Sequence, residues 1–367
     1  MKYLFNFIHP AKFHAFRITI NQLLQNGHNV DIVIISKDIV EELVKNEGWK
    51  YTNIFPEGRR IPHLHTYLSA GINLLRTIYR LLKFMNGKQF DLIITDDLAT
   101  IAGRLKRIPS IFFTDDDLKA VPESVILIAS ANYVLCPAVA YMGKYSKKKI
   151  GYYGLKSLGH LHPNHFVPDR YRLIPALQNE KEDYFFIRCV SATSTHDVGK
   201  KGLGNSTLIK LVTYLEKYGK VIINSQRVLP DELKKYALNF NKMDIGNYLF
   251  YAKMFISDST TMCAEACILG TPSIEFDDWF SDFEQYKELN SKYQLLFGFL
   301  PGNEEGLFKK IDELLNTPQL YEVFQKRRQE FLKNNIDLSS FMIWLFENYP
   351  ISVRQFLQNP NIQNKYK

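Results

Sequence analysis

The chain has 367 residues, 46% of them hydrophobic and 23% charged, and its formal net charge is +8. That length suits two domains of ordinary size or one large α/β domain, and the composition is that of a globular protein. The excess of positive charge is compatible with nucleic acid, an anionic membrane or phosphorylated substrates. Because no basic motif interleaved with aromatic residues accompanies the charge, we expect no nucleic-acid partner.

Three further features predict a cytoplasmic protein. Residues 1–8 are apolar but lead into His9 and Pro10, which indicates a first strand and not a signal peptide. No run of roughly 18 or more apolar residues occurs, so we expect no membrane-spanning helix. The four cysteines are too few and too scattered for a disulfide framework. The basic runs at 144–149 and 326–328 are interpreted as solvated surface, with peripheral contact to the inner membrane leaflet as the alternative.

The first half of the chain alternates predicted strands and helices. Strands are expected at residues 3–8, 30–35, 51–54, 90–95, 109–114 and 133–135. Helices are expected at 13–25, 38–46, 68–85, 99–105 and 125–129. Such alternation implies βαβ crossovers and a parallel, doubly wound sheet.

The alternation restarts after a polar stretch that contains several prolines. Strands are expected at 184–190, 220–224 and 273–276, and a helix followed by a strand is expected over 248–256. Further helices are expected at 208–218, 229–236, 262–269, 304–315, 319–334 and 339–357. We therefore divide the chain into a Rossmann-like domain (1–165), a linker (166–182), a second Rossmann-like domain (183–335) and a helical tail (336–367) able to cross back to the first domain. Two such α/β halves form the arrangement called GT-B, whose ligands bind in an interdomain cleft beyond the carboxyl ends of the strands.

The stretch 257–276 is the most informative part of the sequence. It joins a buried strand to a short helix through a hydroxyl-rich turn that contains Ser259, Thr260 and Thr261, and a Gly-Thr-Pro stop then leads into the next strand. The first N–H groups of a helix are unpaired and its dipole attracts anions, so this turn suits phosphate. Glu265, about one turn into the helix, suits a ribose diol. The alternative is a plain N-cap with a solvated glutamate.

Two histidines follow the first predicted strand. His9 lies at the end of that strand and His14 lies in the first turns of the next helix. A histidine at this position can act as a general base or hydrogen-bond a sugar hydroxyl or a phosphate. The alternative is that His9 caps the turn and His14 packs locally. Because no acidic or cysteine partner is close in sequence, we expect no metal at these histidines.

Two acidic clusters, 95–97 and 114–117, stand at the ends of predicted strands. Neighbouring carboxylates can raise one another's pKa, which suits a general acid or base. We favour Asp115 or Asp116 for that role over Asp96 or Asp97. A divalent metal, or ordinary loop and cap residues, are the alternatives.

Arg188 ends the first strand of the second half and is followed by a hydroxyl-rich loop that carries Lys200. Arginine forms bidentate, charge-assisted contacts with phosphate oxygens, and a neighbouring lysine adds positive charge. We therefore expect Arg188 and Lys200 to contact the same diphosphate as the turn at 259–261. A solvated surface loop is the alternative.

These motifs together resemble the DUF354 family, which is related to the UDP-N-acetylglucosamine 2-epimerase and GT-B glycosyltransferase superfamily. The matching residues are 9–14, 113–116, 153–156, 188, 197–200, 258–262, 265–266 and 269–272. The resemblance implies that Ser259, Thr260 and Thr261 bind the UDP diphosphate and that Glu265 binds the ribose. It also implies no metal and no other cofactor. The epimerase pattern that this turn resembles has glycines where this chain has Thr260 and Thr261.

We therefore predict a cytoplasmic GT-B-type glycosyltransferase that uses a nucleotide sugar, by resemblance a UDP-sugar, in surface-polysaccharide or glycolipid assembly. The partners would be that donor and a glycan or glycolipid acceptor. His9, His14, Asp115 and Asp116 are the candidates for proton transfer. A nucleotide-sugar 2-epimerase, which must remove a C2 proton, is one alternative. A non-catalytic nucleotide-sugar-binding assembly protein is the other.

Overall fold

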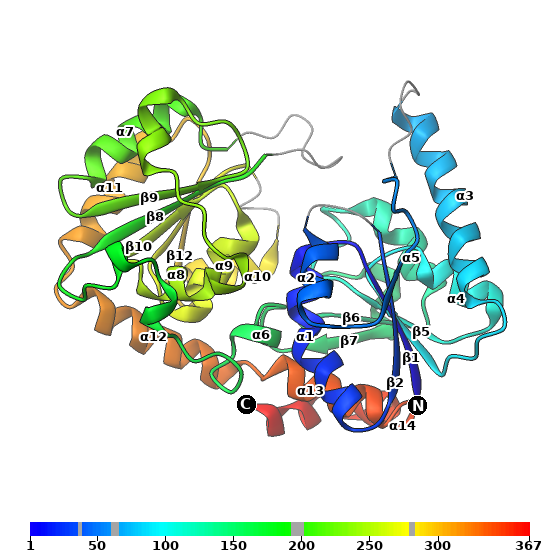
Figure 1. The fold of residues 1–367 in the computed structure, drawn as a ribbon. Coiled ribbons are helices and arrows are strands. Elements are labelled where there is room, and N and C mark those ends of the chain that lie inside the picture. The colour runs from blue at the N-terminus through cyan, green and yellow to red at the C-terminus, as the bar shows by residue number, and fades with distance from the viewer. Residues whose placement is uncertain (36–38, 60–65, 192–201, 279–282) are drawn as a thin grey trace. The chain divides into compact units, whose positions relative to one another are not determined.

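The structure, a computed structural model, describes residues 1–35, 39–59, 66–191, 202–278 and 283–367. The chain divides into two compact units (Figure 1): residues 1–160 with 336–367, and residues 161–335. The C-terminal segment therefore belongs to the first unit. Within the described ranges, no helix is both long enough and apolar enough to cross a membrane.

The described part of the first unit forms one parallel sheet in the order β3-β2-β1-β4-β5-β6-β7. Its strands are β1 (Lys2–Phe7), β2 (Asn29–Ile34), β3 (Tyr51–Asn53), β4 (Leu92–Thr95), β5 (Ser110–Phe113), β6 (Tyr133–Pro137) and β7 (Lys149–Tyr152). Its helices are α1 (Pro10–Gln25), α2 (Val40–Asn46), α3 (Thr66–Met85), α4 (Ala99–Lys106), α5 (Val125–Ser130), α13 (Leu338–Glu347) and α14 (Ile351–Gln358). The chain winds from β1 to one side and then returns to β4 on the other, so the topological switch point lies between β1 and β4.

Both faces of this sheet are covered, which explains why its strands read as continuous apolar runs. On one face, Leu4 of β1 packs in a core with Leu81 of α3. On the other, the ring of Phe5 meets those of Phe16 from α1 and Phe346 from α13, with centroids 5.4 and 6.1 Å away. The C-terminal helices thus complete the core that the N-terminal strand begins.

The described part of the second unit forms a parallel sheet in the order β12-β11-β10-β8-β9. Its strands are β8 (Tyr184–Cys189), β9 (Lys220–Ser225), β10 (Met254–Ser257), β11 (Ser273–Phe276) and β12 (Leu296–Phe299). Its helices are α7 (Asn205–Leu215), α8 (Ile245–Tyr251), α9 (Thr260–Leu269), α10 (Glu284–Ser291), α11 (Glu304–Leu315) and α12 (Leu320–Asn334); α6 (Leu158–Leu161) spans the boundary of the two units. Here the switch point lies between β8 and β10.

Several elements differ from the sequence-based expectation. The strands β7 and β12 and the helix α10 were not predicted. Both strands have four residues and include a glycine, which weakens the strand signal. The predicted helix at 339–357 is two helices, because Pro350 has no N–H to continue the first. The predicted helix at 229–236 is a 3₁₀ segment over Asp231–Tyr236.

Candidate functional site

The turn after β10 is anchored by Asp258. Its carboxylate accepts the backbone N–H groups of Val190 (2.8 Å) and Leu203 (3.3 Å), and it lies 3.6 Å from the guanidinium of Arg227. Gly202 passes so close that a Cβ there would come within 2.7 Å of the Asp258 Cβ. Burial raises the pKa of Asp258, and these donors oppose that rise. Asp258 therefore ties both ends of the loop after β8 to the start of α9.

The first turn of α9 forms a regular helix N-terminus without glycine. Ser259 accepts no capping bond with its side chain, and its own N–H donates to the Ser257 hydroxyl (2.9 Å). Thr260 and Thr261 are the first two helical residues and are partly exposed. Neither has a positive φ. Their β-branched side chains therefore impose no backbone strain, and the helix N-terminus still presents N–H groups and its positive dipole end.

Two further features fix α9 in the unit. Glu265, in its second turn, is buried with 7% of its surface exposed. At the C-terminal end, Arg328 donates to the carbonyl of Ile268 (2.8 Å) and Gln325 to that of Leu269 (3.1 Å). A cation at this end complements the helix dipole. The basic run at 326–328 is thus partly structural.

Arg188 of β8 lies one strand away from that turn, because its backbone pairs with Ser257 in the sheet. Its guanidinium donates to the side-chain carbonyl of Asn224 on β9, while its Nε is buried without a hydrogen-bond partner. Burial lowers its pKa. A buried donor of this kind is stabilised by any acceptor that reaches it. Lys200, predicted to join it, lies outside the described residues.

The two histidines of the first unit differ in setting. His9 is the exposed N-cap of α1, and its Nδ1 accepts the N–H of Ala11 (3.3 Å). That bond places the proton of the neutral ring on Nε2, which makes His9 a donor. The His14 ring contacts that of His160 in a tilted arrangement, with ring centroids 5.2 Å apart, and burial lowers the pKa of His14 to about 4. His14 is therefore neutral near pH 7 and packs locally.

Asp115 is held between two lysines. Lys12 of α1 and Lys156 each approach a different oxygen of its carboxylate, at 2.5 Å. Burial alone would raise the pKa of Asp115, but the two cations outweigh it and hold that pKa below its usual range. Asp115 is thus a poor proton acceptor. Asp116 is half-buried, and its N–H donates to the Thr114 hydroxyl (3.1 Å).

Asp96 stands at the switch point, directly after β4. Its N–H donates to the carbonyl of Asn6 on β1 (3.4 Å), and its Oδ1 is buried without a hydrogen-bond partner. Burial raises the pKa of Asp96 to about 7, although the charge of Lys12 limits the rise. Asp97, by contrast, forms an ion pair with Arg59. Of these aspartates, Asp96 has the ionisation that suits a general base near neutral pH.

Solved structures match the chain over nearly its whole length. The UDP-GlcNAc 2-epimerase from Neisseria meningitidis, bound to UDP-GlcNAc, is 15% identical with a TM-score of 0.67, over 95% of this chain and 100% of that chain. The S. aureus MnaA structure with UDP is 12% identical with a TM-score of 0.69, over 96% and 98%. CalG4, the calicheamicin glycosyltransferase, is 10% identical with a TM-score of 0.60, over 95% and 99%. The chain has the fold of these proteins.

This likeness confirms the predicted two-domain, Rossmann-like α/β fold class. At such low sequence identity, structural similarity supports the fold assignment only. Searches of family models and of curated proteins found no match to the sequence. The resemblance to the DUF354 family therefore stays a prediction.

Sequence reasoning missed one unusual carboxyl, that of Glu275 in β11. Glu275 has no exposed surface, and its carboxyl group interacts with the side chains of Thr260 and Asp277. Burial and the neighbouring Asp277 raise its pKa well above the ordinary value. The signal that could have found it is a charged residue inside a short apolar run. Within the described ranges, no group of three or more His, Cys, Asp or Glu residues is placed to hold a metal ion.

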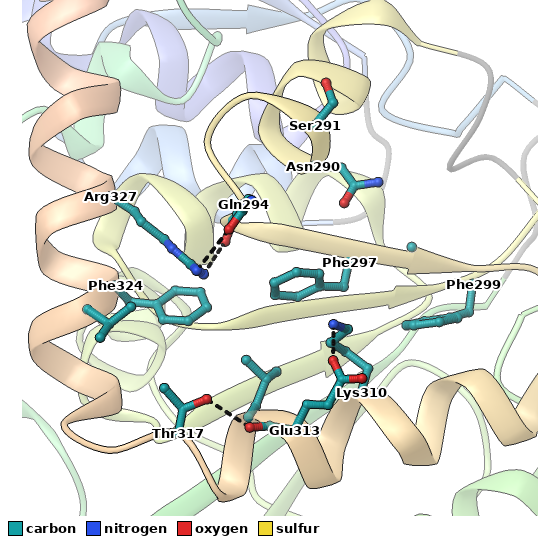
Figure 2. A pocket seen from close by; sticks show the side chains of 13 residues that line it. Asn290, Ser291, Gln294, Phe297, Phe299, Lys310, Glu313, Thr317, Phe324 and Arg327 are labelled. Carbon is teal, nitrogen blue, oxygen red and sulfur yellow. Dashed lines mark hydrogen bonds and ion pairs between the residues drawn. The ribbon is translucent and has the colours of Figure 1, made fainter.

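A cavity of about 620 Å³ runs along β12 (Figure 2). Three phenylalanine rings line it together with Arg327 and Lys310. Arg327 donates to the carbonyl of Gln294 (2.8 Å), and Lys310 pairs with Glu313. No residue of the turn at 259–261 lines this cavity. Its lining carries two cations and one carboxylate, and it is separate in place from the candidate phosphate-binding turn.

Proposed function

We propose that the protein is a cytoplasmic glycosyltransferase that uses a nucleotide sugar, with a UDP-sugar as the first candidate, in surface-polysaccharide or glycolipid assembly. The start of α9 carries the proposal. It is a helix N-terminus without a side-chain cap, it lies beside Arg188, and Asp258 anchors it at the switch point of the second unit. The shared fold supports the choice of donor, since two of the similar structures were determined with UDP or UDP-GlcNAc.

The donor would be held by the second unit. The N–H groups of Thr260 and Thr261 would bind the diphosphate together with the hydroxyls of Ser259, Thr260 and Thr261. Arg188 and Lys200 would add positive charge. Glu265 would accept hydrogen bonds from the ribose hydroxyls. As the bond between the anomeric carbon and the phosphate oxygen breaks, negative charge grows on the diphosphate, and the helix N-terminus stabilises it.

The first unit would supply the proton acceptor. The acceptor hydroxyl attacks the anomeric carbon and loses its proton to Asp96, whose pKa of about 7 leaves a large fraction ionised at neutral pH. His9 would donate from Nε2 to a substrate oxygen. Asp115 would hold Lys12 and Lys156 in place and take no proton itself, and Asp116, half-buried on the next strand end, is the competing base.

The direct test is nucleotide affinity in a Glu265→Ala variant. Hydrogen bonds to a charged group contribute about 1.5–3 kcal/mol each, so we expect UDP-sugar affinity to fall at least tenfold in calorimetry. Glu305→Ala, at an exposed glutamate of α11, is the matched control and should bind like the natural chain. Equal affinity in Glu265→Ala, with the fold intact by circular dichroism, would remove the ribose assignment.

A nucleotide-sugar 2-epimerase is the second candidate, because epimerases are among the proteins with this fold. An epimerase needs no acceptor and must remove the proton from C2 of the sugar. Incubation with UDP-GlcNAc alone in D₂O separates the two reactions. Deuterium incorporation at C2, followed by NMR, would favour the epimerase, whereas transfer that requires an added glycan acceptor would favour the glycosyltransferase.

A further inference from the structure

Helix α3 carries apolar side chains on two opposite sides. Its inner side packs in the core, where Leu81 and Met85 are buried. Its outer side presents Ile72, Leu75 and Tyr79, with exposed fractions of 39%, 67% and 67%. The spacing of these three residues places them on one stripe of the helix. Large apolar side chains gathered on one exposed stripe indicate an interaction surface.

Helices α3 and α4 carry basic residues, and α3, α4 and α5 contain no acidic residue. Lys83 is exposed on α3, and α4 ends in the exposed run Arg104, Leu105, Lys106 and Arg107. Leu105 has 63% of its surface exposed. Glu57 pairs with Arg76 and Arg80 of α3, and Glu123 is exposed before α5. The excess of positive charge beside the exposed apolar side chains therefore rests on Lys83 and the run at the end of α4.

These helices form a connected surface. α4 packs against α3 on one side and against α5 on the other, and Arg104 donates to the carbonyl of Ala129 in α5 (3.0 Å). Figure 1 shows the three helices together on one side of the first unit's sheet. Ile126 of α5 adds a further apolar side chain, 54% exposed. We call this surface, made of the exposed residues of α3, the C-terminal run of α4 and Ile126, the α3–α5 face.

We infer that the α3–α5 face docks on an anionic lipid bilayer. A bilayer surface offers both things that this face lacks: an apolar layer for Ile72, Leu75 and Tyr79, and anionic head groups for the basic run of α4. Interfacial helices bind in this way, and each Lys or Arg near anionic lipid adds about fivefold to the affinity at low salt. Nucleic acid would match the charge but would leave Leu75 and Leu105 without an apolar partner.

This docking goes beyond the proposed reaction and is measured without turnover. The experiment is flotation of the full chain with vesicles of phosphatidylglycerol and phosphatidylcholine, and with vesicles of phosphatidylcholine alone. We expect binding to the anionic vesicles that weakens as salt is raised. Leu75→Ser with Tyr79→Ser should lower the partition coefficient at least tenfold. Lys106→Gln with Arg107→Gln should lower it about 25-fold at low salt.

The second unit provides matched controls. Tyr171 and Val228 are exposed by 86% and 88%, and Lys326 is an exposed cation. Tyr171→Ser with Val228→Ser, and Lys326→Gln, should leave vesicle binding unchanged. Because all of these positions are exposed, each variant should fold, which its melting temperature checks. Absence of flotation with anionic vesicles, an equal loss in the controls, or displacement of the bound chain by an oligonucleotide would overturn the inference.

Discussion

Three strand ends of this protein share one local pattern, a hydroxyl residue followed by aspartate and a further polar residue. They are Thr95-Asp96-Asp97 and Thr114-Asp115-Asp116 in the first unit and Ser257-Asp258-Ser259 in the second. In each, the hydroxyl accepts the N–H two residues on, at 2.9, 3.1 and 2.9 Å. The local sequence thus builds the same turn three times.

The middle aspartates nevertheless differ in chemistry, because their tertiary partners differ. Asp115 faces two lysines, which hold its pKa below the usual range. Asp258 faces two backbone N–H groups and a more distant arginine, and it anchors a loop. Asp96 has a buried oxygen with no partner and a pKa of about 7. A turn is set by neighbours in sequence, whereas ionisation is set by neighbours in space.

The largest expected effect comes from the aspartate that ionises near neutral pH. If Asp96 is the base, Asp96→Asn should lower kcat about 10²- to 10⁴-fold and leave UDP-sugar affinity unchanged. In the natural chain, kcat/KM should rise with pH with a midpoint of about 7, because the ionised form accepts the proton. Steady-state rates across pH 5–9 and calorimetry measure both quantities.

Asp116→Asn separates the two candidate bases. We expect this variant to keep the rate and the pH midpoint, because in this proposal Asp96 is the base that sets both. A loss of kcat in Asp116→Asn together with a normal rate in Asp96→Asn would reverse the assignment and with it the contrast between the two strand ends.

The next effect tests the lysine pair. Lys12→Met leaves the buried Asp115 with Lys156 as its one remaining lysine partner, and breaking a buried ion pair costs about 3 kcal/mol of unfolding free energy. Lys12 also lowers the pKa of Asp96. Its loss should therefore move the midpoint of the kcat/KM profile to higher pH. Urea denaturation and the pH profile of the same variant measure the two effects.

Lys210→Met is the matched control, since Lys210 forms an exposed pair with Glu304 at 2.8 Å. Exposed pairs contribute little, so it should cost less than about 0.5 kcal/mol and leave the pH profile unchanged. If Lys12→Met destabilised the protein but did not shift the midpoint, the proposed coupling of Lys12 to Asp96 in catalysis would be wrong.

These contrasts show which features of the molecule could be predicted from the sequence alone. Apolar runs and turn residues locate most strands, and with them the strand ends where Asp96, Asp115 and Asp258 stand. The tertiary partners of these aspartates could not be located from the sequence. Lys12 lies 103 residues from Asp115 and Lys156 lies 41 residues from it, so no local pattern joins them. Spacing likewise favoured Asp115 over Asp96 as the base, because burial and distant charge are not visible in a single sequence.

The smallest of the three effects concerns Glu275, the buried carboxyl beneath α9. Its pKa in the folded chain is raised above the ordinary value of 4.5, first by burial and then by Asp277, so the folded state holds a proton that the unfolded state releases. The contribution of Glu275 to the free energy of unfolding is therefore fully present below about pH 4.5 and is lost as pH rises, by at most about 1.4 kcal/mol for each pH unit.

Glu275→Gln carries no such proton, and its urea midpoint should fall less steeply between pH 5 and 8. Asp277→Asn should reduce the slope without removing it. Parallel curves for Glu275→Gln and the natural chain would mean that Glu275 is ionised in the fold, and the second unit would then hold a buried negative charge close to the turn proposed to bind the diphosphate.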